Sequence, residues 1–250
     1  MAVSLFRLEP VFDELQPGRR VLDIGATGVH MFDPSATERF VTKRGGRLDE
    51  EWKTLRSDAW NQQQPFGRLL EQAGYLYQSY DIFPAYRTRI VDLNTASASD
   101  PESFDLILNF GTTEHIFNQY NAFKLIHDSC APGGIMWHDV PMSGYFDHGY
   151  FNYQPMFFRN LAAANGYEII RTGFSVHGGP AFDAGILPQY EGERFVLDTS
   201  ENWITQPVPT AGLTAILRKT RSAPFRIALE TQTSDAEISS EIAERYASTG

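Results

Sequence analysis

The sequence predicts an α/β fold in which a mostly parallel sheet of seven strands carries helices on both faces. Most strand candidates are near-continuous apolar runs, which is typical of strands covered on both sides, whereas a half-exposed sheet alternates strictly. Helical segments fall between several of these strands, and this alternation favours parallel strands joined by crossover helices.

Each expected element follows from a local pattern and its boundaries. An apolar run that enters Gly25 predicts a buried strand ending in a tight turn. Strands are expected at residues 21–25, 75–82, 88–93, 104–110, 135–140, 167–174 and 213–219. Helices are expected at residues 4–16, 66–73, 118–130 and 154–164. The last two strands in the chain are expected to add antiparallel edge strands to the sheet.

The chain is expected to form one domain over residues 1–220, followed by a tail over residues 221–250. An insertion is expected at about 30–64, partly helical over 49–60, because this connection is longer than one crossover helix requires. Its basic side chains can meet an anionic substrate or simply form a solvated face, and they are Lys43, Arg44 and Arg47.

Two later segments lack the regular pattern. A Gly- and Pro-rich stretch at about 177–212 is expected to cover one end of the sheet. In the tail, Ile238, Ile242 and Tyr246 stand at i, i+4 and i+8 of a weak helix, and fraying explains that stretch equally well.

Composition and charge exclude several classes of protein. With 42% hydrophobic and 21% charged residues among 250, the chain is globular rather than disordered or fibrous. A net charge of −10 argues against nucleic acid and anionic lipid as partners. The single cysteine, Cys130, excludes an intrachain disulfide and a cysteine-based metal cage. Since neither a membrane-spanning run nor an export signal is seen, we expect a cytoplasmic protein of open oligomeric state.

Polar residues gather just past the carboxyl ends of the expected strands, which is where open parallel sheets bind ligands. In chain order these residues are Asp23, Gly25, Thr27, Gly28, Asp81, Asp92, Asn94, Asn109, Gly111, Glu114, His115, His138 and Asp139. The sequence therefore predicts a binding site at this edge of the sheet.

Several of these residues suit a nucleoside. Gly25 and Gly28 lack a Cβ and allow the backbone to approach a bulky cofactor, although a structural turn explains them as well. Asp81 is placed to accept both ribose hydroxyl hydrogens, or to form an Asx-turn or helix cap. Asp92 and Leu93 are placed to meet an adenine amino group and ring nitrogen, or to form a plain turn.

The ordered motifs resemble those of class I S-adenosylmethionine-dependent methyltransferases. They are RVLDIGATG, SYDI, IVDLN, SFDLILNFGTTEHIFN, APGGIMWHDV and NGYEII, between about residues 19 and 175. The resemblance implies a Rossmann-like fold with S-adenosyl-L-methionine as cofactor. It implies that Asp23, Gly25, Thr27 and Gly28 surround the methionine portion, that Asp81 and Ile82 meet the ribose, that Asp92 and Leu93 meet the adenine, and that Asn109 to Gly111 back the sulfonium pocket.

Two features depart from the family pattern. The usual glycine motif is D-x-G-x-G-x-G, whereas Thr27 and Val29 stand here at its second and third glycine positions. Only residues 82–91 separate Asp81 from Asp92, so the usual second helix is expected to be absent or reduced to one turn.

Methyl transfer is an in-line displacement that depends mainly on positioning, but an alcohol nucleophile also needs a base. His115 and His138 are the candidates because each follows a strand that should flank the methyl group, with Asp139 as an orienting partner of His138. A capping or packing role beside Glu114 is the alternative for His115.

The segment YFDHGYFNYQP supplies an aromatic group that can line a flat or apolar acceptor, or pack against the core. Its aromatic residues are Tyr145, Tyr150, Phe151 and Tyr153. A divalent ion held by His138, Asp139, Asp147 and His148 is a weaker alternative, and because their spacing matches no dedicated cage, no metal is expected.

These observations predict a methyltransferase that acts on a small-molecule acceptor, at an oxygen of a sugar or natural-product precursor. A nicotinamide-dependent oxidoreductase is disfavoured because the motif G-x-G-x-x-G is missing after the first strand. A non-catalytic module that binds a nucleoside or a partner protein is the remaining alternative.

Overall fold

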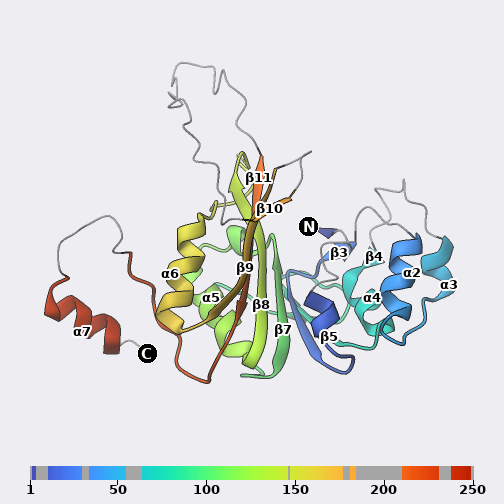
Figure 1. Cartoon of the computed structure of the whole chain (residues 1–250), viewed down its shortest axis with the longest axis horizontal. Coiled ribbons are helices and arrows are strands. Elements are labelled where there is room, and N and C mark those ends of the chain that lie inside the picture. The colour runs from blue at the N-terminus through green and yellow to red at the C-terminus, as the bar shows by residue number, and fades with distance from the viewer. Residues whose placement is uncertain are drawn as a thin grey trace, which may run out of the picture.

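An eight-stranded sheet forms the centre of the protein (Figure 1). The computed structural model describes residues 2–3, 11–29, 34–54, 64–145, 147–176, 181–183, 210–230 and 238–248. From one edge to the other, the strands are β10 (Ala181–Asp183), β9 (Glu168–Val176), β11 (Ala211–Arg218), β8 (Cys130–Ser143), β7 (Phe104–Phe110), β2 (Arg20–Ile24), β5 (Leu76–Asp81) and β6 (Thr88–Ile90). All seven expected strands are present, and β10 is a short addition from the segment expected only to cover the sheet.

The strand directions confirm a mostly parallel sheet and correct one detail. Strands β8, β7, β2, β5 and β6 pair in parallel with their neighbours. Strand β11 is antiparallel to both β8 and β9, so it lies inside the sheet and not at its edge. Because β9 opposes β11, it runs in the same direction as the parallel strands, and the expectation of two antiparallel edge strands was wrong.

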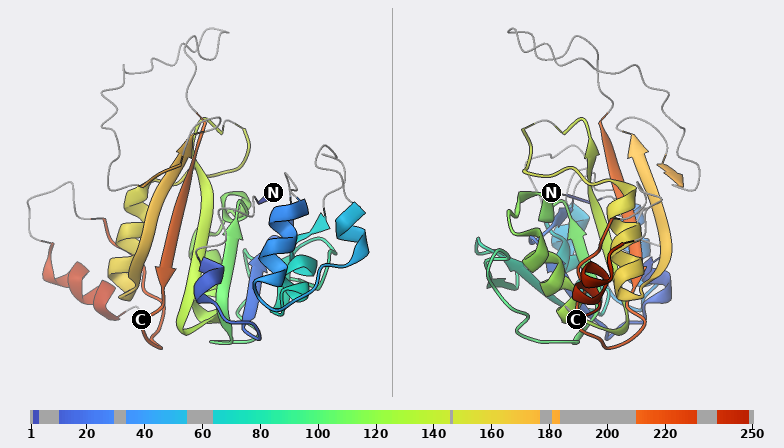
Figure 2. Two further views of the ribbon diagram at one scale, coloured as in Figure 1. Left: turned by 45° about the vertical axis from the view of Figure 1, so that its right-hand side comes forward. Right: turned by 90° about the vertical axis from the view of Figure 1, so that its left-hand side faces the viewer.

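Helices cover both faces of the sheet (Figures 1 and 2). On one face pack α5 (Gln119–Ser129) and α6 (Pro155–Asn165), and on the other packs α4 (Phe66–Gln72) together with the helical residues 11–14. Residues 4–10 of the expected first helix lie outside the described residues. Because successive residues of a strand point to opposite faces of the sheet, each strand contributes side chains to both hydrophobic layers. In β7, Leu106 and Leu108 join one hydrophobic cluster and Ile107 joins the other.

The expected insertion contains α2 (Pro34–Thr42) and α3 (Glu50–Thr54). They anchor to the core through the buried side chains of Phe40 and Trp52. Two of the basic side chains are held by one carboxylate, since Lys43 and Arg44 both donate to Asp13, at 2.7 and 2.9 Å. This pairing favours a structural role for these two cations over capture of an anionic substrate.

A second, small sheet was not expected. It consists of β1 (Ala2–Val3), β3 (Gly28–Val29) and β4 (Gln64–Pro65), with β3 in the middle. It joins the turn after β2 to the end of the insertion, and the amide of Phe66 donates to the carbonyl of Thr27 at 3.0 Å.

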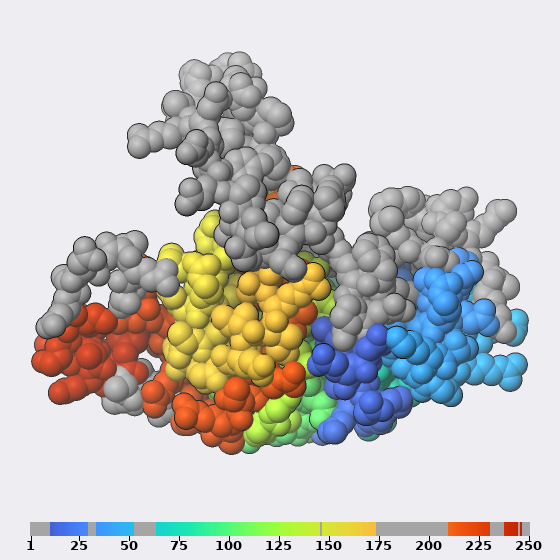
Figure 3. Space-filling view, viewed as in Figure 1, coloured from blue at the N-terminus to red at the C-terminus, as the bar shows by residue number. Residues whose placement is uncertain are grey.

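The tail forms α7 (Ser240–Ser248), at the opposite end of the molecule from α2 and α3 (Figure 3). Ile238 and Ile242 are exposed there. Within the described part of the chain, no helix is both long enough and apolar enough to cross a bilayer.

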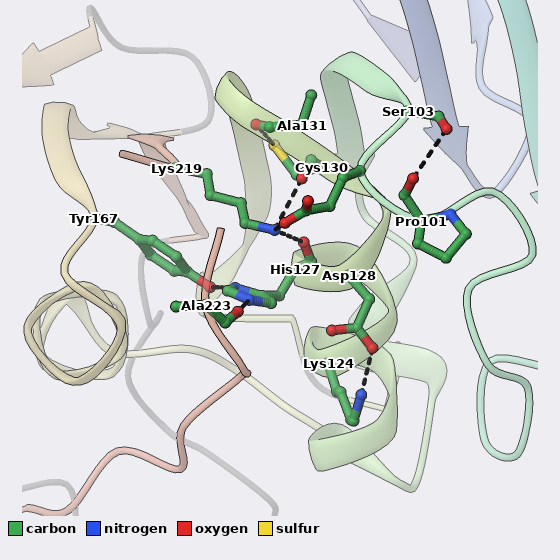
Figure 4. Close-up of polar contacts among 11 residues, drawn as sticks. Pro101, Ser103, Lys124, His127, Asp128, Cys130, Ala131, Tyr167, Lys219 and Ala223 are labelled. Atoms are coloured by element: carbon green, nitrogen blue, oxygen red, sulfur yellow. Dashed lines mark hydrogen bonds and ion pairs between the residues drawn. The ribbon is translucent and has the colours of Figure 1, made fainter. Parts of the chain in front are cut away.

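A buried lysine fastens the chain after β11 to the end of α5 (Figure 4). Lys219 Nζ donates to Glu102 Oε1 and to the carbonyls of His127 and Cys130, each at 3.0 Å. The imidazole of His127 bridges Tyr167 Oη, at 2.5 Å from Nδ1, and the carbonyl of Ala223, at 2.7 Å from Nε2. Because the last carbonyls of a helix lack intrahelical partners, this cation both satisfies and stabilises the C-terminus of α5.

Replacing this lysine should therefore destabilise the fold. Lys219→Met leaves two buried carbonyls and a carboxylate without their partner, and we expect the free energy of unfolding to fall by about 2 to 4 kcal/mol in urea titrations. The control is Lys124→Met, which removes a partly exposed ion pair with Asp128 and should cost less than about 1 kcal/mol. Equal losses in the two variants would contradict this role.

Candidate active site

The turn after β2 is locked against the turn after β7. Gly25 adopts φ +103° and Ala26 φ +42°, so the backbone passes through the left-handed region at both positions. Thr112 Oγ1 donates to the carbonyl of Ile24 at 2.6 Å. A Cβ at Gly25 would lie 1.9 Å from that same Oγ1, and only glycine fits there.

Asp23 and Thr27 face inward and hold this turn together. The Asp23 carboxylate accepts from the amide and hydroxyl of Thr27, at 2.7 and 2.9 Å, and from Tyr77 Oη at 2.8 Å. Burial raises the pKa of Asp23, and these hydrogen bonds oppose the shift. Thr27 stands at the second glycine position of the family pattern, and its amide and hydroxyl belong to this buried set. Gly28 belongs to β3, which leaves Gly25 and Ala26 as the part of the turn best placed to face a ligand.

No helix joins β5 to β6, as expected from the short spacing. Asp81 ends β5, and its Oδ1 accepts from the amide of Phe83 at 3.0 Å. The side chains of Ile82 and Phe83 are exposed beside it. The end of β5 therefore presents a carboxylate next to apolar surface.

Asp92 and Leu93 follow β6. Asp92 Oδ1 accepts from the amide and side-chain nitrogen of Asn94, at 2.9 and 3.0 Å, and these bonds lower its pKa. Leu93 is buried, and its carbonyl accepts from Asn121 Nδ2 at 2.9 Å. Asp92 thus forms a turn of its own while its carboxylate remains exposed to solvent.

Asn109 and Gly111 shape the end of β7. Asn109 is buried, and its Nδ2 lies 2.9 Å from Thr113 Oγ1 and 3.1 Å from His138 Nδ1. Its Oδ1 accepts from the amide of Thr113 at 3.2 Å. Gly111 adopts φ +71° and lets the chain turn sharply after the strand. Asn109 therefore links this turn to β8.

His138 lies in the core and does not line the open edge of the sheet. Its side chain is 1% exposed and packs against Phe123 and Phe158, with ring centroids at 5.6 and 4.9 Å. Burial lowers its pKa to about 3, and the Asn109 amide assigns the acceptor role to Nδ1. Consecutive strand residues face opposite sides, so Asp139 does not face this imidazole. This placement favours the packing role for His138.

Glu114, His115 and His148 form a cluster at the carboxyl end of β7. The Glu114 side chain is 0% exposed, and among the described residues neither carboxylate oxygen has a hydrogen-bond partner. Burial, with the charge of Asp139, raises the pKa of Glu114 to about 7. The Nε2 atoms of His115 and His148 each lie 3.9 Å from Glu114 Oε1, and the two rings are 5.0 Å apart. Burial and the neighbouring His148 lower the pKa of His115.

The sequence singled out the two histidines separately but did not bring them together, and it missed Glu114 as their centre. The loop that carries His148 is held on the glutamate backbone, where the amides of Tyr150 and Phe151 donate to the Glu114 carbonyl at 2.7 and 3.2 Å. The acidic residue directly before His115 in FGTTEH was the available signal.

The expected aromatic group is divided among three places. Phe151 and Tyr153 line a largely apolar groove of about 520 Å³ between α5, α6 and the start of the tail. Tyr150 is exposed and packs edge-on against Phe117, with centroids 5.8 Å apart. The ring of Tyr145 lies 5.6 Å from that of His148.

The family model of the methyltransferase domain matches residues 6–175. The chain belongs to this family. It is therefore an S-adenosylmethionine-dependent methyltransferase, which excludes the alternative of a nicotinamide-dependent oxidoreductase. No curated protein matches the sequence.

The methyltransferase is also similar to solved structures at low sequence identity. An S-adenosylmethionine-dependent methyltransferase from Archaeoglobus fulgidus is 12% identical with a TM-score of 0.47, over 86% of this chain and 92% of that chain. The 1,6-didemethyltoxoflavin-N1-methyltransferase of Burkholderia thailandensis is 14% identical with a TM-score of 0.44, over 87% and 76%. A methyltransferase from Leishmania major is 14% identical with a TM-score of 0.44, over 85% and 70%.

The residues at the ends of β2 and β5 fit the cofactor of the methyltransferase. Adenosine offers hydroxyl donors on its ribose and a flat apolar base. Asp81 Oδ2 makes no hydrogen bond to any residue that the structure describes, and Ile82 and Phe83 supply exposed apolar surface next to it. The backbone at Gly25, which carries no Cβ, lies at the end of the neighbouring strand β2.

The buried neutral state of His138 should make stability depend on pH. Its folded pKa of about 3 lies below the unfolded value near 6.5, so its contribution is complete above pH 6.5 and is lost as the pH falls toward 3. Compared with His138→Gln, the wild type should lose about 1 to 2 kcal/mol more stability between pH 7 and pH 5 in urea titrations.

Glutamine is the matched replacement because it keeps an acceptor for Asn109 and does not titrate in this range. A difference in unfolding free energy that stays constant with pH reports the change in packing. A difference in how steeply the unfolding free energy falls with pH reports the titration of His138. Parallel stability curves would show that the imidazole is not held neutral.

Proposed function

We propose that this methyltransferase moves the methyl group of S-adenosylmethionine to a hydroxyl oxygen of a small-molecule acceptor, such as a sugar or a natural-product precursor. The observation that carries this proposal is the cluster of Glu114, His115 and His148 at the end of β7. A hydroxyl nucleophile loses a proton as it attacks, and a half-exposed imidazole at this edge is suited to take it. The net charge of −10 disfavours nucleic acid as the acceptor.

The cofactor is proposed to lie across the carboxyl ends of β2, β5 and β6. Asp81 accepts from the ribose hydroxyls with Ile82 beside it, and Asp92 with Leu93 meets the adenine. The turn at Gly25 surrounds the methionine portion, with Asp23, Thr27 and Gly28 supporting that turn from within. Support comes from the partly exposed Asp81, the exposed Asp92 and the partly exposed backbone of the turn at Gly25.

Asn109 and Gly111 are proposed to back the pocket for the methyl group. S-adenosylmethionine supplies an electrophilic methyl carbon when bound. His115 takes the proton of the acceptor hydroxyl as the new C–O bond forms and the C–S bond breaks, which leaves S-adenosylhomocysteine. The base is assigned to His115 because its side chain is 45% exposed. The imidazole of His138 is buried, and its neighbour Asp139 does not face it, so this pair lacks access to the acceptor.

The groove between α5 and α6 is the proposed seat for an apolar part of the acceptor. Its wall includes Gln119, whose Nε2 donates to the carbonyl of Thr113 at 2.7 Å, directly beside Glu114 in the chain. Tyr153 Oη donates to Gln119 Oε1 at 2.6 Å and continues this wall. The groove therefore lies next to the turn that carries the cluster.

Calorimetric titration with S-adenosylhomocysteine tests the cofactor site, with NADH as the contrast ligand. The wild type should bind the former alone. Asp81→Asn should weaken binding by about 100-fold, because two charge-assisted hydrogen bonds to the ribose are lost. Asp100→Asn, which removes a surface partner of Arg89, is the control and should bind normally. Unchanged affinity in Asp81→Asn would remove this residue from the site.

Incubation of the enzyme with S-adenosylmethionine and a panel of hydroxylated small molecules tests the acceptor class. The readout is the formation of S-adenosylhomocysteine. With an accepted substrate, His115→Gln should lower kcat by at least about 100-fold and leave cofactor affinity intact, because a base contributes to turnover and not to cofactor binding. Asp147→Asn, a change at an exposed carboxylate in the same loop as His148, should keep full activity. Full activity in both His115→Gln and His138→Gln would rule out a histidine base.

A further inference from the structure

One carboxylate of this site is buried without a hydrogen-bond partner among the described residues. Both oxygens of Glu114 lack hydrogen bonds to the residues that the structure describes, although the side chain is fully buried. Burial of an ionised carboxylate is costly unless a cation or a set of donors compensates for it. Glu114 relieves this cost either by taking up a proton or by binding a cation, and the groups around it decide between the two.

Two imidazoles, which are also metal-binding groups, lie next to this carboxylate. His115 Nε2 and His148 Nε2 each lie 3.9 Å from Glu114 Oε1, and one ligand atom from each of the three residues lies within 4.8 Å of the other two. Asp139 adds negative charge nearby, which favours a cation further.

This arrangement is built into the fold and does not depend on a chance approach of two loops. The amides of Tyr150 and Phe151 fix the His148 loop on the carbonyl of Glu114. Gly149 lies so close that a Cβ there would be 3.0 Å from both Cγ and the carbonyl oxygen of Glu114. A larger residue at this position would require Glu114 to shift by a few tenths of an ångström.

The ligand types decide which ion fits. Two imidazole nitrogens and one carboxylate oxygen suit zinc, iron(II), cobalt(II) and related ions, whereas magnesium and calcium prefer oxygen ligands alone. The side chains of His115 and His148 are 45% and 42% exposed, so the far side of such an ion would remain open to solvent or to a ligand.

We propose that Glu114, His115 and His148 bind one divalent transition-metal ion that keeps open positions for an acceptor hydroxyl. The binding of the ion stands by itself, and its use in catalysis rests on the proposed function. Because the imidazole of His115 cannot serve as ligand and base at once, the ion replaces His115 as the activating group in the metal-loaded protein. The coordinated hydroxyl then loses its proton to solvent water, and its oxygen forms the C–O bond as the C–S bond breaks.

The test uses tag-free full-length protein that has been stripped of metal with a chelator. Co²⁺ is titrated with visible absorption as the readout, and Zn²⁺ with calorimetry. We expect one equivalent to bind, and we expect Glu114→Gln and His148→Gln each to weaken binding at least about tenfold. Excess Mg²⁺ should not displace Co²⁺.

The matched control is Asp100→Asn, which removes a surface carboxylate that pairs with Arg89 on another segment of the chain and should bind metal like the wild type. Circular dichroism checks the fold of each variant, and the half-exposed His148 provides a second test if Glu114→Gln does not fold. Absence of a bound equivalent in the wild type, or equal affinity in all four proteins, would overturn the proposal.

The titration needs neither cofactor nor acceptor, so its failure would leave the proposed methyl transfer standing. If instead Co²⁺ binds as expected and no hydroxylated acceptor is methylated, the metal site is supported and the proposed function fails. The two proposals can therefore be rejected independently.

Discussion

One hydrogen bond joins the two turns on which the site is built. Thr112 Oγ1 donates to the carbonyl of Ile24 and lies where a Cβ of Gly25 would be, so the chain after β2 and the chain after β7 are in direct contact. This contact sets the distance between the glycine turn and the turn that carries Glu114. A cofactor held by the first turn is thereby placed at a fixed distance from any acceptor held by the second.

The buried polar groups of this protein fall into two kinds. Asp23 and His138 are buried but have partners, and they secure the geometry of the sheet edge without facing a ligand. Glu114 is equally buried and has no hydrogen-bond partner among the described residues. Ser129 Oγ and Trp137 Nε1 also lack a hydrogen-bond partner among the described residues, but of these buried groups only the Glu114 carboxyl can ionise. Since an unsatisfied buried ionisable group costs the most free energy, Glu114 is the place where function is expected.

The sequence predicted the seven main strands because buried strands leave continuous apolar runs, and it predicted the family from motifs at their ends. It could not place β11 between β8 and β9, since no local pattern encodes the order of strands. It expected His138 at the open edge, whereas alternation along β8 turns this side chain into the core. Glu114 was listed at this edge, but its place between the two histidines was not foreseen, because the loop around Gly149 meets it only in the folded chain.

The position of β11 has a consequence for how the protein is made. Strand β8 is synthesised early, but one of its edges has no partner until residues 211–218 follow. At about 5 to 20 residues per second, a ribosome exposes that edge for several seconds, during which it is open to pairing with other nascent chains. A stall between residues 143 and 211 would lengthen this interval and thereby promote aggregation.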